Sequence, residues 1–221
     1  MDIVKSHQDI QNSLLEWFSD NGRNWIPWKL NKDGSIPQSG EIISPYEIWI
    51  AEVMLQQTQL KVVIPYWERW MNMFPSLSHL VDADLQNVLL LWQGLGYYSR
   101  ANRIHQSSKI LMKLVGWNKY NEPHSWPFEL NQWMSLPGIG RSTAGSIISS
   151  AFDLPAPILD GNVKRIFSRL LATERISIKE TKRFWEFSSL LIANLSPRDI
   201  NQALMDLGAL ICTPKKPRCS S

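Results

Sequence analysis

The sequence predicts an all-α fold, and three observations lead to that prediction. Apolar residues recur three or four positions apart through most of the chain, which is the spacing of one helix face. Capping residues, prolines and glycines mark the expected helix ends. No stretch alternates apolar and polar residues convincingly over the length of a strand. Because most joins are short, helices adjacent in sequence should pack antiparallel or nearly so.

The first helix is expected near the N-terminus and should end at about Asn21. Its apolar face comprises Ile10, Leu14, Trp17 and Phe18. Residues 23–43 are expected to be loop, because prolines and glycines interrupt every possible element there.

The clearest helix start in the chain is Ser44-Pro45-Tyr46-Glu47. Serine is a good N-cap, proline suits the first helical position, and a glutamate three residues after the serine completes a capping box. A single helix is predicted to run from here to about Val63 and to carry Glu52.

Further helices are predicted from the same periodicity. They are expected at about residues 85–92, 101–112, 130–134, 163–170, 184–195 and 197–211, with one more after a glycine turn at 136–140. A polar loop is expected at 117–127.

The composition is that of an ordinary globular protein. Of 221 residues, 44% are hydrophobic and 19% are charged, so a sizeable core is available. The net charge of +3 permits nucleic-acid binding without arguing for it, since a local basic patch matters more than the total. Two cysteines give no disulfide framework. The N-terminus is polar and no apolar run of about 18 residues occurs, so we expect a soluble, cytoplasmic protein with no membrane partner.

The glycine turn Leu136-Pro137-Gly138-Ile139-Gly140 leads directly into a helix. Its two glycines allow a positive φ and a close approach of a ligand. Ser142 and Thr143 can cap the helix, whose first N–H groups are free to bind a phosphate. Such a turn alone is equally typical of an ordinary loop.

Two carboxylates are the candidates for chemistry. Glu52 lies among mostly apolar helix neighbours, so its carboxyl is either paired with a cation or has a raised pKa. On this helix alone, a glutamate at the rim of the core is as good an interpretation as a functional one. The amides of Gln56, Gln57 and Gln59 favour function, because amides suit contacts with base edges.

Asp160 follows the apolar residues Ile158 and Leu159 and is expected to cap a helix that begins at Gly161. That structural role is compatible with a catalytic one. Glycosyl hydrolysis uses two carboxyl groups, one that holds a proton in an apolar setting and one that stays ionised. Glu52 fits the acid, and Asp160 at a helix N-terminus fits the anion.

Residues 136–165 (LPGIGRSTAGSIISSAFDLPAPILDGNVKR) and 51–58 (AEVMLQQT) resemble the helix-hairpin-helix DNA glycosylases of the endonuclease III superfamily. The amino-acid sequences of both segments are similar to those of the adenine glycosylase (MutY-type) branch. The resemblance implies two helical lobes: a six-helix lobe with the helix-hairpin-helix motif at 44–154, and a second lobe from 1–43 plus 155–221. Residues 31–41 look like an insertion relative to the family.

The resemblance also implies residue roles. Glu52 would protonate an adenine leaving group and Asp160 would stabilise the sugar cation. Gln57 and Tyr97 resemble residues that fill the gap left by a flipped base. The other positions implied to contact DNA or the base are Gln56, Gly138, Gly140, Trp28, Leu55, Ser142 and Asn162.

Position 142 separates two branches of the family. Relatives that resemble endonuclease III carry a lysine there, which forms a Schiff base with the sugar and cuts the strand. Ser142 therefore implies a monofunctional enzyme. The nearest lysine in the motif is Lys164.

Cys212 and Cys219 match the spacing of the first two of four cysteines that ligate a [4Fe–4S] cluster in the family. Such a cluster needs four thiolates, and this chain has two cysteines. We therefore expect either a truncated piece of a longer protein or an absent or incomplete cluster.

These inferences lead to one hypothesis and two alternatives. The hypothesis is a monofunctional DNA glycosylase of base excision repair that acts as a monomer on double-stranded DNA and removes adenine mispaired with 8-oxoguanine or guanine. A glycosylase for T:G mismatches or oxidised pyrimidines is one alternative. A non-catalytic DNA-binding fragment is the other, although it would need neither Glu52 nor Asp160.

Overall fold

The computed structural model describes residues 3–115 and 126–219, and every regular element within those residues is helical. The all-α prediction is therefore confirmed. The elements are α1 (Ile3–Asn21), the 3₁₀ helix η1 (Pro27–Lys29), α2 (Pro45–Leu55), α3 (Leu60–Met73), α4 (Leu77–Asp82), α5 (Leu85–Trp92), α6 (Ser99–Val115), α7 (Leu130–Met134), α8 (Arg141–Phe152), α9 (Gly161–Leu170), α10 (Ile178–Leu191) and α11 (Pro197–Leu210). No helix in the described part of the chain is long and apolar enough to cross a membrane.

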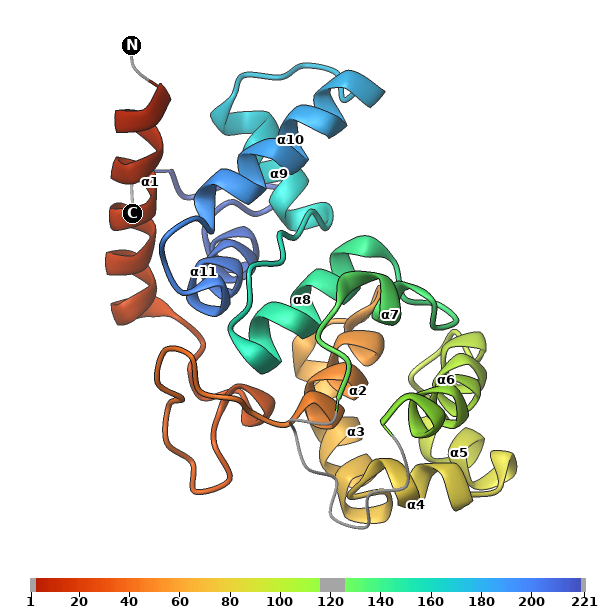
Figure 1. Ribbon diagram of the computed structural model, residues 1–221. Helices are drawn as coiled ribbons and strands as arrows, with labels where there is room; N and C mark the ends of the chain where they lie inside the picture. The colour runs from red at the N-terminus through yellow and green to blue at the C-terminus, as the bar shows by residue number, and fades with distance from the viewer. Residues whose placement is uncertain (1–2, 116–125, 220–221) are drawn as a thin grey trace.

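The helices form two groups, with α8 between them (Figure 1). Helices α2 to α7 make one group, and α1, α9, α10 and α11 make the other. Helix α8 packs against α2 in the first group and against α11 in the second. Buried hydrophobic residues form two clusters, one in each group. The lobe boundaries at 44 and 154 stay a prediction; Ile26 and Trp28, which precede residue 44, belong to the first cluster.

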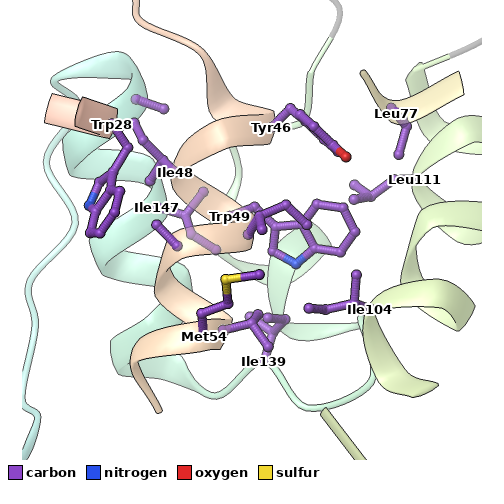
Figure 2. Packing of buried hydrophobic residues seen from close by; sticks show 14 of the residues in the cluster. Trp28, Tyr46, Ile48, Trp49, Met54, Leu77, Ile104, Leu111, Ile139 and Ile147 are labelled. Carbon is purple, nitrogen blue, oxygen red and sulfur yellow. The ribbon is translucent and has the colours of Figure 1, made fainter. Parts of the chain in front are cut away.

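Aromatic side chains around α2 form the centre of the first cluster. Figure 2 shows Trp49 on the side of α2 that faces Ile104 and Leu111, whereas Trp28 lies on the other side of the helix. Trp49 is fully buried, and its ring centroid lies 6.5 Å from that of Trp133. Large apolar rings packed in this way contribute much of a core's stability and hold α2 in place from both sides.

The prediction that the helix starting at Ser44 continues to about Val63 is wrong, because α2 ends at Leu55. Gln57 has a φ of 57°, and a left-handed residue interrupts a right-handed helix. Arg100 of α6 donates hydrogen bonds to the last carbonyls of α2, so the helix end is satisfied from outside. Residues 46–64 contain no glycine or proline, so the local sequence gave no sign of this break. The part of α3 beyond Val63 and the whole of α4 were likewise not predicted.

The predicted caps are confirmed at Ser44, Asp160 and Ser196, whose side chains accept backbone N–H groups of α2, α9 and α11. The cap predicted for α8 is wrong, because Gly140 is the N-cap and no side chain caps that end. The Ser142 hydroxyl instead accepts a hydrogen bond from the backbone N–H of Leu159 at 2.9 Å.

The loop predicted at 23–43 is interrupted by the 3₁₀ helix η1 at Pro27–Lys29. Its 31–41 segment is irregular and is tied to α11 and to the end of α8. The Arg198 guanidinium donates to the carbonyls of Gln38 and Glu41, and Asp153 accepts the N–H of Gly40 at 2.8 Å. The polar loop predicted at 117–127 lies mostly outside the described residues.

Gly145 of α8 lets the segment that leads to Asp160 run directly across the helix. A Cβ atom at position 145 would lie 2.4 Å from the carbonyl oxygen of Pro157. The hydrogen bond from Leu159 to Ser142 fixes the same segment one helical turn away. These two contacts set the position at which Asp160 begins α9.

Gly145→Ala is therefore expected to destabilise the protein by about 1–3 kcal/mol, because the added methyl group forces α8 and the 156–159 segment apart. Urea unfolding measures this change. Gly161→Ala is the matched control, since a Cβ there meets open space and should leave stability unchanged or raise it slightly. Equal stabilities for the two variants would contradict the close-approach argument.

Candidate active site

A cavity of about 580 Å³ lies where residues of α2, α8, α9, α11 and the loop after α1 meet. Of the residues singled out in the sequence, it brings together Trp28, Glu52, Leu55, Gln56, Gln57, Ser142, Asp160 and Asn162. Tyr97, Gly138, Gly140, Cys212 and Cys219 do not line it. The volume falls in the range of pockets that hold small ligands, about 300–1,000 Å³.

Glu52 projects from α2 into this cavity. Removal of its carboxyl from water raises the pKa of Glu52 to about 7. The nearby Ser146 hydroxyl opposes that rise, the Asp160 carboxylate adds to it, and the Lys29 ammonium lowers the pKa again to a smaller extent. Glu52 thus keeps its proton at pH values between about 4.5 and 7, where an ordinary glutamate is ionised.

Asp160 faces the same cavity from the N-terminus of α9. Its Oδ1 accepts the backbone N–H of Val163 at 2.8 Å, and its Oδ2 accepts the side-chain amide of Asn162 at 3.4 Å. Burial raises the pKa of Asp160, while the N–H groups of Val163 and Asn162 and the charge of Arg165 oppose the rise. The hydrogen bonds hold the carboxylate in one orientation toward the cavity.

A buried charge cluster on the cavity wall was not found from the sequence. Asp206 of α11 is 1% exposed, and its carboxylate binds the Arg23 guanidinium at 2.6 Å and the Lys29 ammonium at 3.3 Å. Burial lowers the pKa of Lys29, and the Asp206 carboxylate opposes that shift. The available signal was Asp206 itself, a carboxylate next to Met205 and Leu207 on an apolar helix, which requires a cation once it is buried.

Asn162 is held from behind by Arg165. The Arg165 guanidinium donates to Asn162 Oδ1 and to the carbonyl of Gly208, each at 2.7 Å. The same guanidinium donates to the carbonyl of Cys212 at 2.7 Å. A Cβ at Gly208 would meet Asn162 Cβ at 2.6 Å, so α11 and the start of α9 are in close contact.

The two cysteines do not make up the ligand set of a [4Fe–4S] cluster. Cys212 is half-buried and its Sγ accepts a hydrogen bond from Arg169 at 3.2 Å, whereas Cys219 is exposed. Among the described residues, no three or more His, Cys, Asp or Glu side chains are grouped so as to hold a metal ion. Two thiolates fall short of the four that such a cluster needs.

Two loops carry the residues expected to enter DNA, and only the loop after α2 lines the cavity. Gln57 lies in the loop after α2 with a φ of 57°, and Tyr97 lies in the loop before α6 with a φ of 50°. Gln56 joins the first loop to the glycine turn, because its side-chain amide donates to the carbonyl of Gly138 at 3.2 Å. Gly138 has a φ of 82°, which favours glycine, and Gly140 opens α8 with free N–H groups.

The sequence of this chain matches a known protein family. The model for the HhH-GPD superfamily of base excision DNA repair proteins matches residues 50–189. The chain belongs to this superfamily. The match contains both carboxylates and the glycine turn, so the resemblance inferred from the two motifs is confirmed at the family level.

Similar members of the superfamily carry the name adenine DNA glycosylase. One from Buchnera aphidicola subsp. Schizaphis graminum is 39% identical over 212 residues, covering 94% of this chain and 55% of that protein. One from Homo sapiens is 37% identical over 212 residues, covering 95% of this chain and 37% of that protein. The chain therefore spans about half or less of the length of these relatives.

Solved structures share the fold. A thermostable thymine-DNA glycosylase matches with a TM-score of 0.79 at 22% identity, covering 98% of this chain and 92% of the other. A non-covalent endonuclease III–DNA complex matches with a TM-score of 0.72 at 20% identity, covering 100% of this chain and 92% of the other. At these identities the likeness concerns the fold alone.

The geometry supplies an acid and an anion in one cavity. A carboxyl group with a pKa of about 7 can donate a proton near neutrality and accept one back. Asp160, fixed by its cap hydrogen bonds, can stabilise a positive charge that develops next to it. This division of roles between two carboxyl groups agrees with hydrolysis through a cationic intermediate.

The raised pKa of Glu52 predicts a pH-dependent stability difference. The folded state holds the Glu52 proton up to pH about 7, whereas a glutamate in the unfolded chain has its ordinary pKa of 4.5. The folded protein therefore binds more protons in that window, so the contribution of Glu52 to its free energy of unfolding falls as pH rises from about 4.5 to 7 and levels off above the folded pKa. Urea unfolding of the native protein and Glu52→Gln at pH 5, 6, 7 and 8 measures this.

The free energy of unfolding of the native protein is expected to fall by up to roughly 3 kcal/mol relative to that of Glu52→Gln across the window, since each pKa unit corresponds to about 1.4 kcal/mol. Other titrating groups are common to both proteins and largely cancel. A stability difference that stays constant from pH 5 to 8 would contradict the raised pKa.

Proposed function

We propose that this chain is the catalytic part of a monofunctional adenine DNA glycosylase, which hydrolyses the N-glycosidic bond of adenine mispaired with 8-oxoguanine or guanine in double-stranded DNA. The observation that carries the proposal is the presence of Glu52, with a pKa of about 7, in the same cavity as Asp160. The names of the relatives support adenine as the base.

In the proposed reaction, Glu52 donates its proton to the adenine ring as the bond from the base to the sugar C1′ breaks. The bonding electrons leave with the base, and the sugar becomes a cation that the Asp160 carboxylate stabilises. A water molecule then adds its oxygen to C1′, and its proton passes to the Glu52 carboxylate, which restores the acid. Asn162 keeps Asp160 in place through its amide hydrogen bond.

The cavity wall offers groups that suit a purine. Adenine carries ring-nitrogen acceptors and an exocyclic amino donor. Lys29 and Arg23 can donate to the ring nitrogens, and Trp28 provides an apolar surface for the flat base. Such a pocket is open to a base only after it leaves the helical stack, so the proposal includes base flipping.

The glycine turn and the two exposed loops provide the DNA-binding side of the proposal. Free N–H groups at Gly138 and Gly140 suit a backbone phosphate. Gln57 and Tyr97 project from strained, exposed loops and can enter the gap that a flipped base leaves. A non-catalytic DNA-binding fragment would account for these loops but gives no reason for a protonated carboxyl group beside Asp160.

Replacing either carboxyl group should separate catalysis from binding. Glu52→Gln is expected to bind mismatched duplex normally while adenine release falls about 10²–10⁴-fold, because the general acid is lost. Asp160→Asn keeps an N-cap acceptor but removes the charge, so folding should persist and chemistry should slow. Single-turnover release from duplexes with A:G, A:8-oxoguanine or T:G pairs tests both variants and the base preference. Near-normal release by Glu52→Gln would refute its role as the acid.

The proposal also predicts that the DNA strand stays intact after base release. Ser142 replaces a nucleophilic amine, and the Lys29 ammonium in the cavity is engaged by Asp206, which keeps it from attacking a sugar. Borohydride should trap no covalent protein–DNA adduct, and strand cleavage should appear only after alkali. Lys164 does not line the cavity, so Lys29→Gln is the informative control. An adduct that disappears in Lys29→Gln would show that the enzyme is bifunctional.

A further inference from the structure

Two loops near the cavity hold non-glycine residues in the left-handed backbone region. Gln57 in the 56–59 loop has a φ of 57°, and Tyr97 in the 93–98 loop has a φ of 50°. Both side chains are exposed, and Tyr97 is 62% exposed. Such backbone conformations are unfavourable for residues other than glycine and persist only where neighbouring groups hold them. Some group must therefore fix these loops.

Arg100, at the start of α6, supplies that fixing group. Its side chain is buried, with 4% exposure, between the two loops. Toward the first loop, one terminal nitrogen donates to the carbonyl of Gln56 at 2.5 Å and to that of Met54 at 2.8 Å. The other terminal nitrogen donates to the Thr58 hydroxyl at 3.1 Å. Two of these acceptors belong to Gln56 and Thr58, the residues immediately before and after Gln57.

The same guanidinium holds the second loop. It donates to the carbonyls of Leu95 and Gly96 at 3.2 and 3.1 Å. It also lies 5.4 Å from the centre of the Tyr97 ring and 5.2 Å from that of Trp92. A guanidinium can do this because it presents five donors in a rigid plane, whereas a lysine ammonium is a single point.

We propose that Arg100 is a positioning residue that couples the 56–59 and 93–98 loops, so that Gln57 and Tyr97 enter the DNA duplex together at a fixed separation. This inference rests on the proposed function, because it assigns the two side chains to the gap beside a flipped base. Arg100 itself touches neither the base nor the sugar in this account. Its loss should impair opening of the duplex and leave the bond-breaking step intact.

Arg198 provides a matched control for loss of a buried guanidinium. It is 2% exposed, and it donates to the carbonyl of Ser150 at 2.8 Å and to the carbonyls of Gln38 and Glu41. It therefore clamps a loop to a helix much as Arg100 does, but away from Gln57 and Tyr97. Arg100→Lys and Arg198→Lys should both lower stability, and rates are to be compared per folded molecule.

The first test compares adenine release from two substrates. One is an A:8-oxoguanine duplex, and the other carries the same adenine in an unpaired bubble that is already open. Arg100→Lys is expected to slow release from the duplex about tenfold to a hundredfold, because Gln57 and Tyr97 would be misplaced. It should slow release from the bubble far less. Arg198→Lys should act equally on both substrates. Equal slowing of both substrates by Arg100→Lys would overturn the inference.

The second test measures insertion without relying on base release. A 2-aminopurine placed next to the target adenine brightens when the stack opens, and the Glu52→Gln background prevents turnover. Arg100→Lys should lose most of this signal, and it should add no further loss to the Gln57→Ala, Tyr97→Ala double variant, because all three act as one unit. Full signal in Arg100→Lys, or an additive loss, would overturn the inference.

The two tests separate the inference from the function on which it rests. If the native protein releases no adenine from duplex or bubble, the proposed function is refuted, and the 2-aminopurine signal alone decides the role of Arg100. If the native protein is active and Arg100→Lys behaves like Arg198→Lys in both tests, the function stands and Arg100 is only structural.

Discussion

The close packing of α8 between the two helix groups is the constraint on which the site depends. On one side α8 packs against α2, which carries Glu52; on the other it packs against α11, which carries Asp206. Gly145 removes the side chain that would hold the 156–159 segment away from α8, and that segment ends at Asp160. Glu52 and Asp160, which are distant in sequence, therefore reach one cavity because α8 has neighbours on both faces.

Bringing these charges together is unfavourable for folding, and the structure offsets it locally. Glu52 avoids an ionised state by holding a proton, as its pKa of about 7 indicates. Asp206 is paired with two cations, Arg23 and Lys29. Asp160 is stabilised by N–H groups at the start of α9. The three acids on the cavity wall are therefore stabilised in three different ways, and this difference determines which of them can donate a proton.

The sequence predicted most features whose cause is local. Caps at Ser44, Asp160 and Ser196 depend on residues within one helical turn, and the structure has all three. The end of α2 was mispredicted because the group that stabilises it, Arg100, is 44 positions from Gln56 in the chain. The wall formed by Arg23, Lys29 and Asp206 was missed for the same reason, since its partners meet only after the helices pack. The roles assigned to the site residues, by contrast, rest on resemblance and stay predictions.

Guanidinium groups, two of them buried, join separate segments at three places in the described part of the chain. Arg100 joins two exposed loops, Arg198 joins the 31–41 loop to α8, and Arg165 joins the start of α9 to the Cys212 carbonyl. The backbone carbonyls of a loop are strong acceptors that need donors once they are buried. One planar donor can satisfy several of them at once, which orders a loop and leaves its side chains free to face a ligand. In this fold, the helices fix where the carboxyl groups lie, and the arginines fix where the exposed loops lie.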